Sequence, residues 1–415
     1  VPANFEGGFI EISSDNVHVV YIPIGSLDTF IPLDTEGTSN SYIADRGAAS
    51  YSFTATIMGN GADGIIDEGK FEDASGNILT KAGGANIHPL SAKLLWQDTD
   101  ELVEQVGLSD GKVQVKMGRS RGNALIAVYD KANPNAEDAK VLWSWHLWCT
   151  PVPQIIECAT SIYTGNNYKV MDRNLGATTS EPNLGTTQGL HYQFGRKDPF
   201  SGSLSYDGER TILYDVRSST SILKAEIIDE AIQIRQALNF PDIYFLRHSD
   251  QEDWYEGVGA HYLWGNPEGR ASVHPVKTTK TIYDPCPAGY KILPGDVFFV
   301  FARTTKPSEY SNEIICKVEN LNSLFYVKKI EDGGTTFYAD GAGVDETKLI
   351  YLPLAYSPQW AAGKLHSSGY YWTSSPRGDD LWYQGFTFYN QSGSTYWLNN
   401  GLPSWRLASV RCVKE

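Results

Sequence analysis

The segment 369–413 constrains the fold of this chain more than any other stretch, because it interleaves aromatic residues with residues typical of turns. It holds four of the eleven tryptophans, Trp372, Trp382, Trp397 and Trp405. Its short runs, such as WYQGFTF at 382–388, alternate in the manner of β-strands and are separated by Gly, Asn, Ser and Pro. The pattern predicts a loop-rich β core, with some rings left to stack against a flat or ring-shaped ligand.

The chain length of 415 residues exceeds what one ordinary hydrophobic core accommodates, so we expect two domains. The best boundary is Thr150-Pro151-Val152-Pro153, because paired prolines interrupt both sheet ladders and helices. We therefore predict a first domain at 1–153 and a second domain at 154–415.

The predicted first domain consists almost entirely of strand-like runs separated by clusters of Gly, Asn and Asp. These runs lie at 9–12, 17–22, 51–57, 85–96, 112–116, 123–129 and 141–148. Short strands at regular spacing predict a β-sandwich. The run 141–148 is apolar on both sides, so we expect a central strand in which His146 is a hydrogen-bonded core residue.

The predicted second domain contains one helical pattern, at 222–238. Apolar residues recur there near helical spacing, at Ile227, Ile228, Ala231, Ile234, Ala237 and Leu238. Candidate N-caps precede the pattern at 219–221, and Pro241 follows its end. A single helix packed on a twisted sheet, with long loops and short strands, is typical of an α+β domain.

The charge balance restricts the possible partners. Acidic residues outnumber basic residues by 49 to 34, which gives a net charge of -15. Nucleic acid is excluded, because a phosphate-binding face requires clustered Lys and Arg and the chain has no such cluster. No apolar run is long enough to span a bilayer, and the first residues, VPANFEGG, do not form a signal peptide. We expect an exported protein that contacts the outer membrane only through a removed or missing anchor.

An odd number of cysteines leaves at least one thiol unpaired within the chain. The five are Cys149, Cys158, Cys286, Cys316 and Cys412. The favoured disulfide joins Cys286, in the turn-rich segment DPCPAG, to Cys412 in the last predicted strand. The alternative is five reduced, buried thiols in a cytosolic protein. No cysteine spacing suggests zinc and the histidines are scattered, so no metal site is predicted.

Five segments from about residue 160 onward resemble the Fibrobacter succinogenes major paralogous domain, which occurs in many exported Bacteroidetes proteins. In the order of that family they are MDRNLGA at 171–177, YQFGRKDPF at 192–200, DPCPAGY at 284–290, YWTSS at 371–375 and VRCV at 410–413. The N-terminal part, with LLW at 94–96 and WSWHLW at 143–148, is similar to domains that precede this module in fimbrillin-like tip proteins of Bacteroides-type pili.

This resemblance implies a mainly β protein, with a transthyretin-like β-sandwich followed by a C-type-lectin-like α+β domain. It also implies an exported, lipoprotein-derived adhesin at the cell surface or fimbrium. Within the matched motifs, we expect Asp172, Arg173 and Asn174 to form a charge-assisted network that holds a strand end rather than a ligand.

The matched motifs also bear on the cysteines. A bond between Cys286 and Cys412 would staple the C-terminal fold. Cys149, Cys158 and Cys316 belong to none of the motifs, so the pairing of these three residues stays open.

The aromatic C-terminal segment supplies the best candidate for a ligand-binding surface. Rings stack on the apolar faces of sugars, while Asn and Arg side chains bond to hydroxyl groups. The candidate residues are Trp382, Tyr383, Tyr396, Trp397, Asn399, Asn400, Trp405 and Arg406, and WYEG at 254–257 and WGN at 264–266 could join the same surface. The alternative for each ring is a place in the hydrophobic core.

Several short motifs match functional patterns but lack the context that gives those patterns meaning. Glu181-Pro182-Asn183 matches a tripeptide of some calcium-dependent sugar-binding sites, but the chain has no Trp-Asn-Asp motif to accompany it. The RGD tripeptide at 377–379, together with Asp380, is interpreted as a charged turn. Gly-x-Ser-x-Gly at 107–111 and 118–122 flanks a short strand, which predicts hairpin turns rather than nucleophile elbows. The acids Asp250, Glu252 and Asp253 have no evident partner acid for glycoside hydrolysis. We therefore predict no catalytic residue and no cofactor.

These observations together predict a cell-surface adhesion protein and not an enzyme. Its second domain would recognise a host or microbial glycan or protein. Its first domain would join other pilus subunits by β-strand addition, in which main-chain hydrogen bonds supply the affinity. The alternatives are a structural scaffold without a small ligand and an exported carbohydrate-active enzyme. The sequence leaves open the ligand, its metal dependence and the position of the subunit in a pilus.

Overall fold

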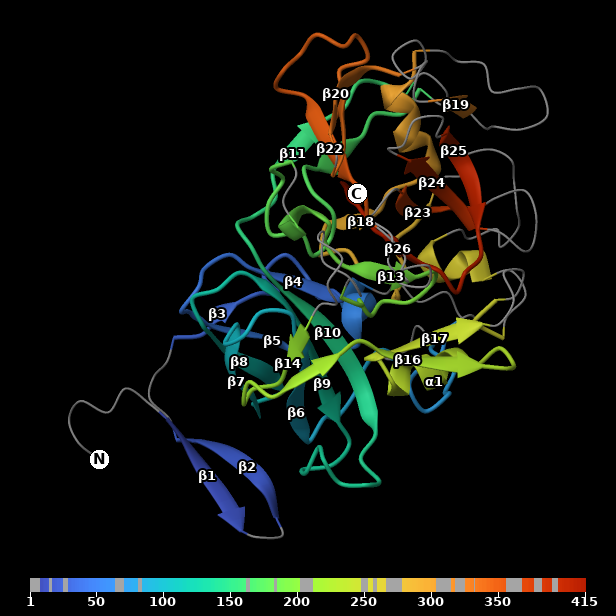
Figure 1. The fold of residues 1–415 in the computed structure, drawn as a ribbon. Helices are drawn as coiled ribbons and strands as arrows, with labels where there is room; N and C mark the ends of the chain where they lie inside the picture. Colours follow the sequence, from blue (N-terminus) through green and yellow to red (C-terminus); the bar gives the residue numbers. More distant parts are fainter. Residues whose placement is uncertain are drawn as a thin grey trace.

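The structure, a computed structural model, describes most of the chain as short strands joined by loops. The described residues are 8–14, 17–24, 29–63, 71–80, 84–161, 165–182, 185–201, 212–247, 253–256, 260–265, 278–303, 315–317, 325–331, 333–355, 368–376, 383–389 and 395–415. These residues form several separate sheets, and helices are few and short (Figure 1). The mainly β fold class predicted from the sequence is therefore confirmed.

Two sheets build the N-terminal part. One has the order β15 (Thr220–Ile222), β14 (Ile212–Tyr214), β6 (Ser91–Gln97), β9 (Gly122–Tyr129), β10 (Val141–Cys149) and β4 (Ser41–Ala44). The other has the order β3 (Ile31–Pro32), β5 (Ser50–Thr54), β8 (Lys112–Met117) and β7 (Val103–Ser109). The two sheets contact each other through buried rings, since the ring centroids of Phe53 on β5 and Trp145 on β10 lie 5.4 Å apart.

Strand β10 lies inside its sheet, as the sequence predicted. It pairs antiparallel with β9 and parallel with β4. Trp143, Trp145 and Trp148 are all buried, so both faces of the strand are covered. The apolar residues on both faces of β10 explain its position inside the sheet, because a strand that is buried on both sides gains from apolar residues at every position.

The two Gly-x-Ser-x-Gly motifs have different structures. The first ends in the β7–β8 hairpin, where Asp110 and Gly111 have φ angles of 50° and 71°, as a tight turn with two left-handed residues requires. The second, at 118–122, carries the chain from β8 to β9 in the other sheet, so the predicted hairpin is wrong there. Strands β5 and β7 already occupy both edges of β8, and the next strand must therefore join another sheet.

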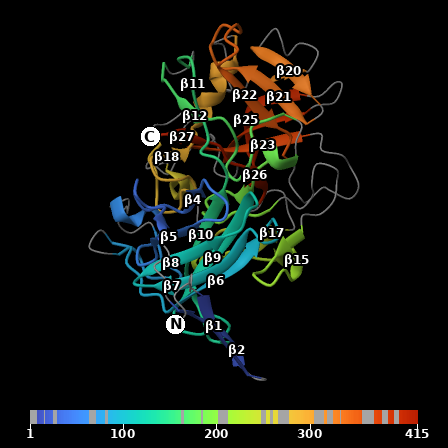
Figure 2. The same ribbon diagram turned by 90° about the vertical axis from the view of Figure 1, so that its left-hand side faces the viewer.

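Five sheets contain the remaining strands (Figure 2). A four-stranded sheet has the order β11 (Ile155–Glu157), β12 (Lys169–Met171), β27 (Cys412–Lys414) and β18 (Tyr290–Ile292). A six-stranded sheet has the order β13 (His191–Gln193), β26 (Leu407–Ser409), β23 (Ser368–Pro376), β24 (Tyr383–Tyr389), β25 (Thr395–Leu402) and β19 (Ile315–Lys317). The three smaller sheets consist of β20 (Val327–Glu331), β21 (Gly334–Tyr338) and β22 (Leu349–Pro353); of β16 (Lys224–Ile228) and β17 (Ile243–Arg247); and of β1 (Gly8–Ser14) and β2 (Val17–Ile24).

The predicted helix at 222–238 is wrong over most of its length. Residues 220–222 and 224–228 are strands β15 and β16, and only α1 (Ile234–Asn239) is α-helical. Strand β16 pairs in parallel with β17, which lies beyond the helix and so could not enter a local pattern. Ile222, Ile227 and Ile228 are β-branched and suit a strand once such a partner exists.

The other helices among the described residues are 3-10 helices of three to seven residues that connect strands. They are η1 (Gly59–Asp63), η2 (Gly185–Thr187), η3 (Ala260–Trp264) and η4 (Gly295–Phe301). No helix among the described residues is long and apolar enough to cross a membrane.

The two predicted domains share a hydrophobic core. Strands β14 and β15, which follow the predicted boundary, extend the N-terminal sheet through the pairing of Tyr214 with Gln97 (Figure 1). One apolar cluster includes Trp143 and Trp145 of β10 together with Trp264 and Trp372. A boundary at 153/154 would therefore not separate two independent cores, and the division into two domains stays a prediction.

Candidate functional site

The C-terminal six-stranded sheet brings most of the predicted ligand-binding residues onto two neighbouring strands. Tyr383 begins β24, and Tyr396, Trp397, Asn399 and Asn400 lie in the adjacent antiparallel strand β25. In this register Trp397 is opposite Thr387 and Asn400 is opposite Gly385. The side chains of these two strands and the whole of Trp382 lie outside the described part of the structure, so the predicted ligand face is placed here by its backbone alone.

Trp405 and Arg406 follow β25 and are described in full. Trp405 is only 3 % exposed and belongs to the main apolar cluster, which is the alternative that the sequence left open for each ring. Arg406 is half-buried, and its guanidinium carbon lies 5.8 Å from the ring centroids of both Trp405 and Tyr370. Sequence reasoning missed Tyr370, although it stands in the aromatic run GYYW at 369–372 that precedes the YWTSS motif.

Two further candidate rings from the sequence belong to the core. Trp254 and Trp264 are both buried. The indole N–H of Trp254 donates to the carbonyl oxygen of Phe194 at 3.0 Å, and the ring of Phe194 lies 4.8 Å from that of Trp264. These two tryptophans therefore support the sheet from inside.

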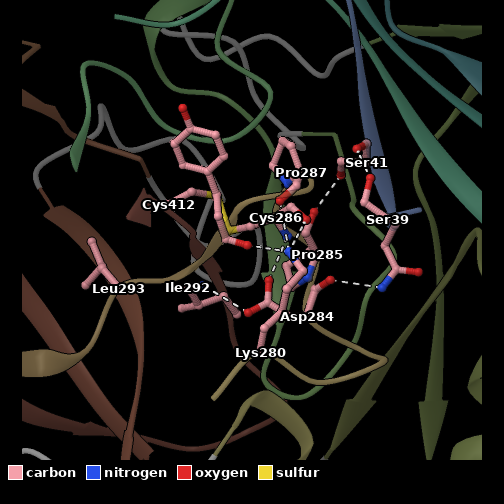
Figure 3. The surroundings of a disulfide bond; sticks show 12 residues. Ser39, Ser41, Lys280, Asp284, Pro285, Cys286, Pro287, Ile292, Leu293 and Cys412 are labelled. Atoms are coloured by element: carbon pink, nitrogen blue, oxygen red, sulfur yellow. Dashed lines mark hydrogen bonds between the residues drawn. A yellow bond between two sulfur atoms is a disulfide. The ribbon is translucent and has the colours of Figure 1, made fainter. Parts of the chain in front are cut away.

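A disulfide bond joins Cys286, in the loop before β18, to Cys412 at the start of β27 (Figure 3). It joins residues that are 126 positions apart, and it is the pair that the sequence favoured. Cys149 and Cys158 are buried free thiols, and burial raises the pKa of Cys149 to about 11 and of Cys158 to about 12. Both thiols are therefore protonated and unreactive at neutral pH.

The loop that carries Cys286 is held by two buried charged residues (Figure 3). The Lys280 ammonium donates to the carbonyl oxygens of Cys286 at 2.8 Å and Pro287 at 2.9 Å. The Asp284 carboxylate accepts the backbone N–H groups of Cys286 at 2.8 Å and Ile292 at 3.0 Å. Burial raises the pKa of Asp284, and the charge of Lys280 opposes that shift, so the two residues stabilise one loop conformation together.

The same loop is bonded to the N-terminal part of the chain. The Asn40 amide donates to the carbonyl oxygens of Ile282 at 2.7 Å and Asp284 at 2.9 Å. The Ser41 hydroxyl donates to the carbonyl oxygen of Pro285 at 2.6 Å. These donors satisfy carbonyl groups of an irregular loop that would otherwise be buried without partners. The disulfide loop therefore links the N-terminal sheet, through Ser41 of β4, to the four-stranded sheet that contains Cys412 on β27.

Asp172, Arg173 and Asn174 form a buried network, as expected. Arg173 makes a two-bond ion pair with Asp172, at 2.8 and 2.9 Å. Asn174 accepts two bonds from the Arg411 guanidinium, at 3.0 and 2.7 Å, and donates to the carbonyl oxygen of Gln188 at 3.0 Å. All of these side chains are buried, so the motif residues serve the fold of the C-terminal sheets.

His146 is a hydrogen-bonded core residue, as predicted. Its Nδ1 lies 3.1 Å from the Ser41 hydroxyl and its Nε2 lies 2.9 Å from the Asn123 side-chain oxygen. Burial lowers the pKa of His146 to about 3, because the charged imidazolium would lose its hydration. The residue is therefore neutral in the folded protein throughout the pH range in which an unfolded histidine titrates.

This depressed pKa predicts a stability that falls with acidification. Below pH 6.5 the unfolded chain binds a proton at His146 and the folded chain does not, so each pH unit down to about pH 3 costs about 1.4 kcal/mol. Between pH 6.5 and pH 4.5 we expect a loss of about 2.3 kcal/mol from this residue, because the unfolded histidine is already half protonated at pH 6.5. Urea denaturation of wild type and His146→Gln across this range gives the free energy of unfolding at each pH. The difference between the two slopes against pH is the contribution of His146.

The exposed residue His88 is the matched control for this measurement. His88→Gln removes an exposed imidazole and is expected to change the slope of the free energy of unfolding against pH less than His146→Gln does. Equal slopes for wild type and His146→Gln would contradict the neutral, buried state of His146.

Sequence reasoning missed two buried basic residues in the motif YQFGRKDPF. The Arg196 guanidinium carbon lies 4.8 Å from the ring centroid of Phe200, and the Nη1 of the same group donates to the carbonyl oxygen of Ile243 at 2.8 Å. The Lys197 ammonium bonds to Asp198 at 2.6 Å and to the Ser144 hydroxyl at 2.5 Å. No local signal distinguishes such residues from surface charges, because their partners come from distant strands.

The remaining motifs from the sequence offer no further site. Asn183, the RGD segment with Asp380, Asp250 and Glu252 lie outside the described residues. The Asp253 carboxylate accepts the Ser404 hydroxyl at 2.6 Å. In the described ranges, no three His, Cys, Asp or Glu side chains gather where they could hold a metal ion.

Comparison of the chain with protein-family models, curated proteins and solved structures finds no match.

Proposed function

We propose that this chain is an exported cell-surface adhesion protein, of the kind found at a pilus tip, which recognises a glycan or protein through its C-terminal sheets. In this proposal the N-terminal sheets form a transthyretin-like sandwich and the C-terminal part a C-type-lectin-like domain, held to the outer membrane by a lipoprotein anchor. The main support for this proposal is the register of β24 and β25, in which Tyr383, Trp397 and Asn400 lie on adjacent strands. Aromatic rings beside amide groups suit sugar recognition.

The fold supports a binding role for this surface in a second way. The disulfide, the Lys280–Asp284 loop and the Arg411–Asn174 bonds fix the strands β18 and β27 and the segment that joins β26 to β27. A rigid support reduces the entropy that binding would otherwise cost. A shallow aromatic surface on such a support gains affinity without rearrangement.

A glycan array with wild type and Trp397→Ala tests the proposal. We expect wild type to bind a defined group of glycans and the variant to lose about tenfold or more in affinity, because stacking of one ring on a sugar contributes on the order of 1 kcal/mol or more. Tyr326→Ala, which changes a half-buried ring just before β20, is the control and should bind like wild type. A blank array for wild type, or equal binding by Trp397→Ala, would count against a glycan-binding face on β25.

A structural subunit is the second candidate, and one observation favours it. The β1–β2 hairpin pairs with no other described strand and projects from one end of the molecule in both views (Figures 1 and 2). An isolated two-stranded hairpin is marginally stable in water, so a third strand from another subunit would stabilise it. Sedimentation of wild type and Val19→Pro tests this idea, because proline removes one backbone donor from β2. Assembly that the substitution leaves intact would exclude the hairpin as the joining element.

A further inference from the structure

The environment of Arg406 differs from that of the other buried arginines. Arg173, Arg196 and Arg411 each donate at least two side-chain hydrogen bonds to protein acceptors. The Arg406 side chain donates none within the described part of the chain. Its Nε is buried without a partner, as are the Nε of Arg196 and one Nη of Arg411, but those two residues have other side-chain bonds. A guanidinium with buried, unused donors is costly unless something else pairs with them.

Two more unused donors lie beside Arg406. The indole N–H of Trp405 and the hydroxyl of Tyr244 are buried and have no hydrogen-bond partner. The guanidinium carbon is 5.8 Å from the Trp405 ring centroid, and Tyr244 packs in one buried cluster with Leu407, the residue that follows Arg406. Three unsatisfied donors therefore share one neighbourhood, where native proteins ordinarily leave few such groups.

The half-buried ring of Tyr370 completes this neighbourhood. It lies on β23, 5.8 Å from the Arg406 guanidinium carbon, and so borders the same charge. A positive planar group that offers parallel N–H donors matches a carboxylate or sulfate. A neighbouring ring matches the apolar face of a sugar. The two features together select an acidic saccharide over a neutral one.

We propose that Arg406, with Tyr370 beside it and the donors of Trp405 and Tyr244 behind it, forms a site for a saccharide that carries a carboxylate or sulfate group. The proposal rests on the glycan-binding function proposed above and names its ligand class. The anion would accept hydrogen bonds from Arg406, and the sugar ring would lie against Tyr370. A charge-assisted pair of this kind contributes about 1.5 to 3 kcal/mol, or about ten- to a hundredfold in affinity.

The net charge of the chain limits the size of this ligand. At -15 the protein repels a long polyanion, although the screening length is only about 8 Å at physiological salt. A short saccharide with few charges meets little of this repulsion, whereas its contact with a half-buried guanidinium is screened less than a contact at the surface. The geometry therefore points to short acidic oligosaccharides.

Titration calorimetry of the full chain tests the site with four probes: trigalacturonate, a sulfated chondroitin disaccharide, neutral maltotriose and a capped tri-aspartate peptide. We expect one or both acidic saccharides to bind more tightly than maltotriose. Because the chondroitin disaccharide carries a uronate carboxylate as well as a sulfate, its unsulfated form is the added comparison that isolates the contribution of the sulfate group. Arg406→Gln should weaken acidic binding about tenfold or more. Arg406→Lys, which retains the charge without the planar fork, should lose part of the affinity and serves if the Gln variant does not fold.

Arg303 provides the matched control. Its guanidinium carbon lies 4.3 Å from the ring centroid of Tyr326, but its Nε already donates to the carbonyl oxygen of Phe325 at 3.0 Å. Arg303→Gln should bind acidic saccharides within twofold of wild type.

The outcomes separate this proposal from the broader one. Neutral saccharide binding that Arg406→Gln leaves unchanged, without preference for acidic probes, would overturn the acidic site and leave glycan recognition standing. Binding of the tri-aspartate peptide alone would overturn the saccharide ligand in favour of an acidic protein segment. Binding of no probe by wild type would overturn the site proposed here, while the glycan array decides the function.

Discussion

Replacement of both Cys286 and Cys412 by alanine is expected to lower the free energy of unfolding by about 5 kcal/mol, the largest effect of any change considered for this protein. The bond joins residues 126 positions apart, and its loss releases that loop in the unfolded chain. The chain-entropy relation for a loop of this length gives about 5 kcal/mol at 25 °C. Urea denaturation followed by tryptophan fluorescence measures the loss.

The two free thiols supply a matched control for this prediction. Cys149→Ala with Cys158→Ala removes two buried sulfur atoms from the same chain without breaking a cross-link. We expect this control to lose only the free energy of burying the thiols, on the order of 1 kcal/mol for each. Equal losses in the two double variants would mean that the covalent cross-link adds nothing to the free energy of unfolding.

The second large effect is expected for Asn40→Ala, which should lower the free energy of unfolding by about 3 to 5 kcal/mol. The Asn40 side chain is buried, donates to the carbonyl oxygens of Ile282 and Asp284, and accepts the indole N–H of Trp143 at 3.0 Å. Its removal leaves buried polar groups unpaired, each of which costs about 1 to 3 kcal/mol. The loss is reduced in part because Asn60 also donates to Asp284, at 3.0 Å.

Asn77→Ala is the matched control, since Asn77 is exposed and its amide bonds only to the carboxylate of neighbouring Asp73, at 2.9 Å. We expect it to change stability by less than about 1 kcal/mol. A double-mutant cycle of Asn40→Ala with the Cys286–Cys412 replacement should also show non-additivity of at least about 0.5 kcal/mol, because both changes act on one loop. Additive losses would show that the N-terminal contact and the disulfide stabilise independent parts.

Several features of the fold followed from the sequence because they depend on neighbouring residues. Apolar residues at both alternating positions of 141–148 predicted a strand buried on both sides, and β10 is such a strand. The pair Asp110–Gly111 tolerates left-handed backbone, and it forms the β7–β8 turn. His146 was predicted as a core residue since its apolar neighbours on β10 require burial. Each prediction used only the period of a strand or the conformational range of a turn residue.

The candidate site could be predicted only in part. Composition identified the aromatic strands β24 and β25. The sequence also favoured a bond between Cys286 and Cys412, and these two residues are joined in the structure. The pattern could not reveal that Trp254, Trp264 and Trp405 are buried, because a ring suits a core and a ligand surface equally well. Tyr244 was also missed as a neighbour of Arg406, since β17 precedes that residue by more than 150 positions.

The sequence by itself determined that this chain forms many short strands, with a doubly buried strand at 141–148 and a hairpin turn at 107–111. Only the tertiary structure decided that 224–228 pairs with β17 instead of forming a helix, that β14 and β15 extend the N-terminal sheet, and that Asn40 bonds to the disulfide loop. The physical reason is that strands and buried polar groups take their hydrogen-bond partners from distant positions. A local pattern records which faces must be buried, but not which segments cover them.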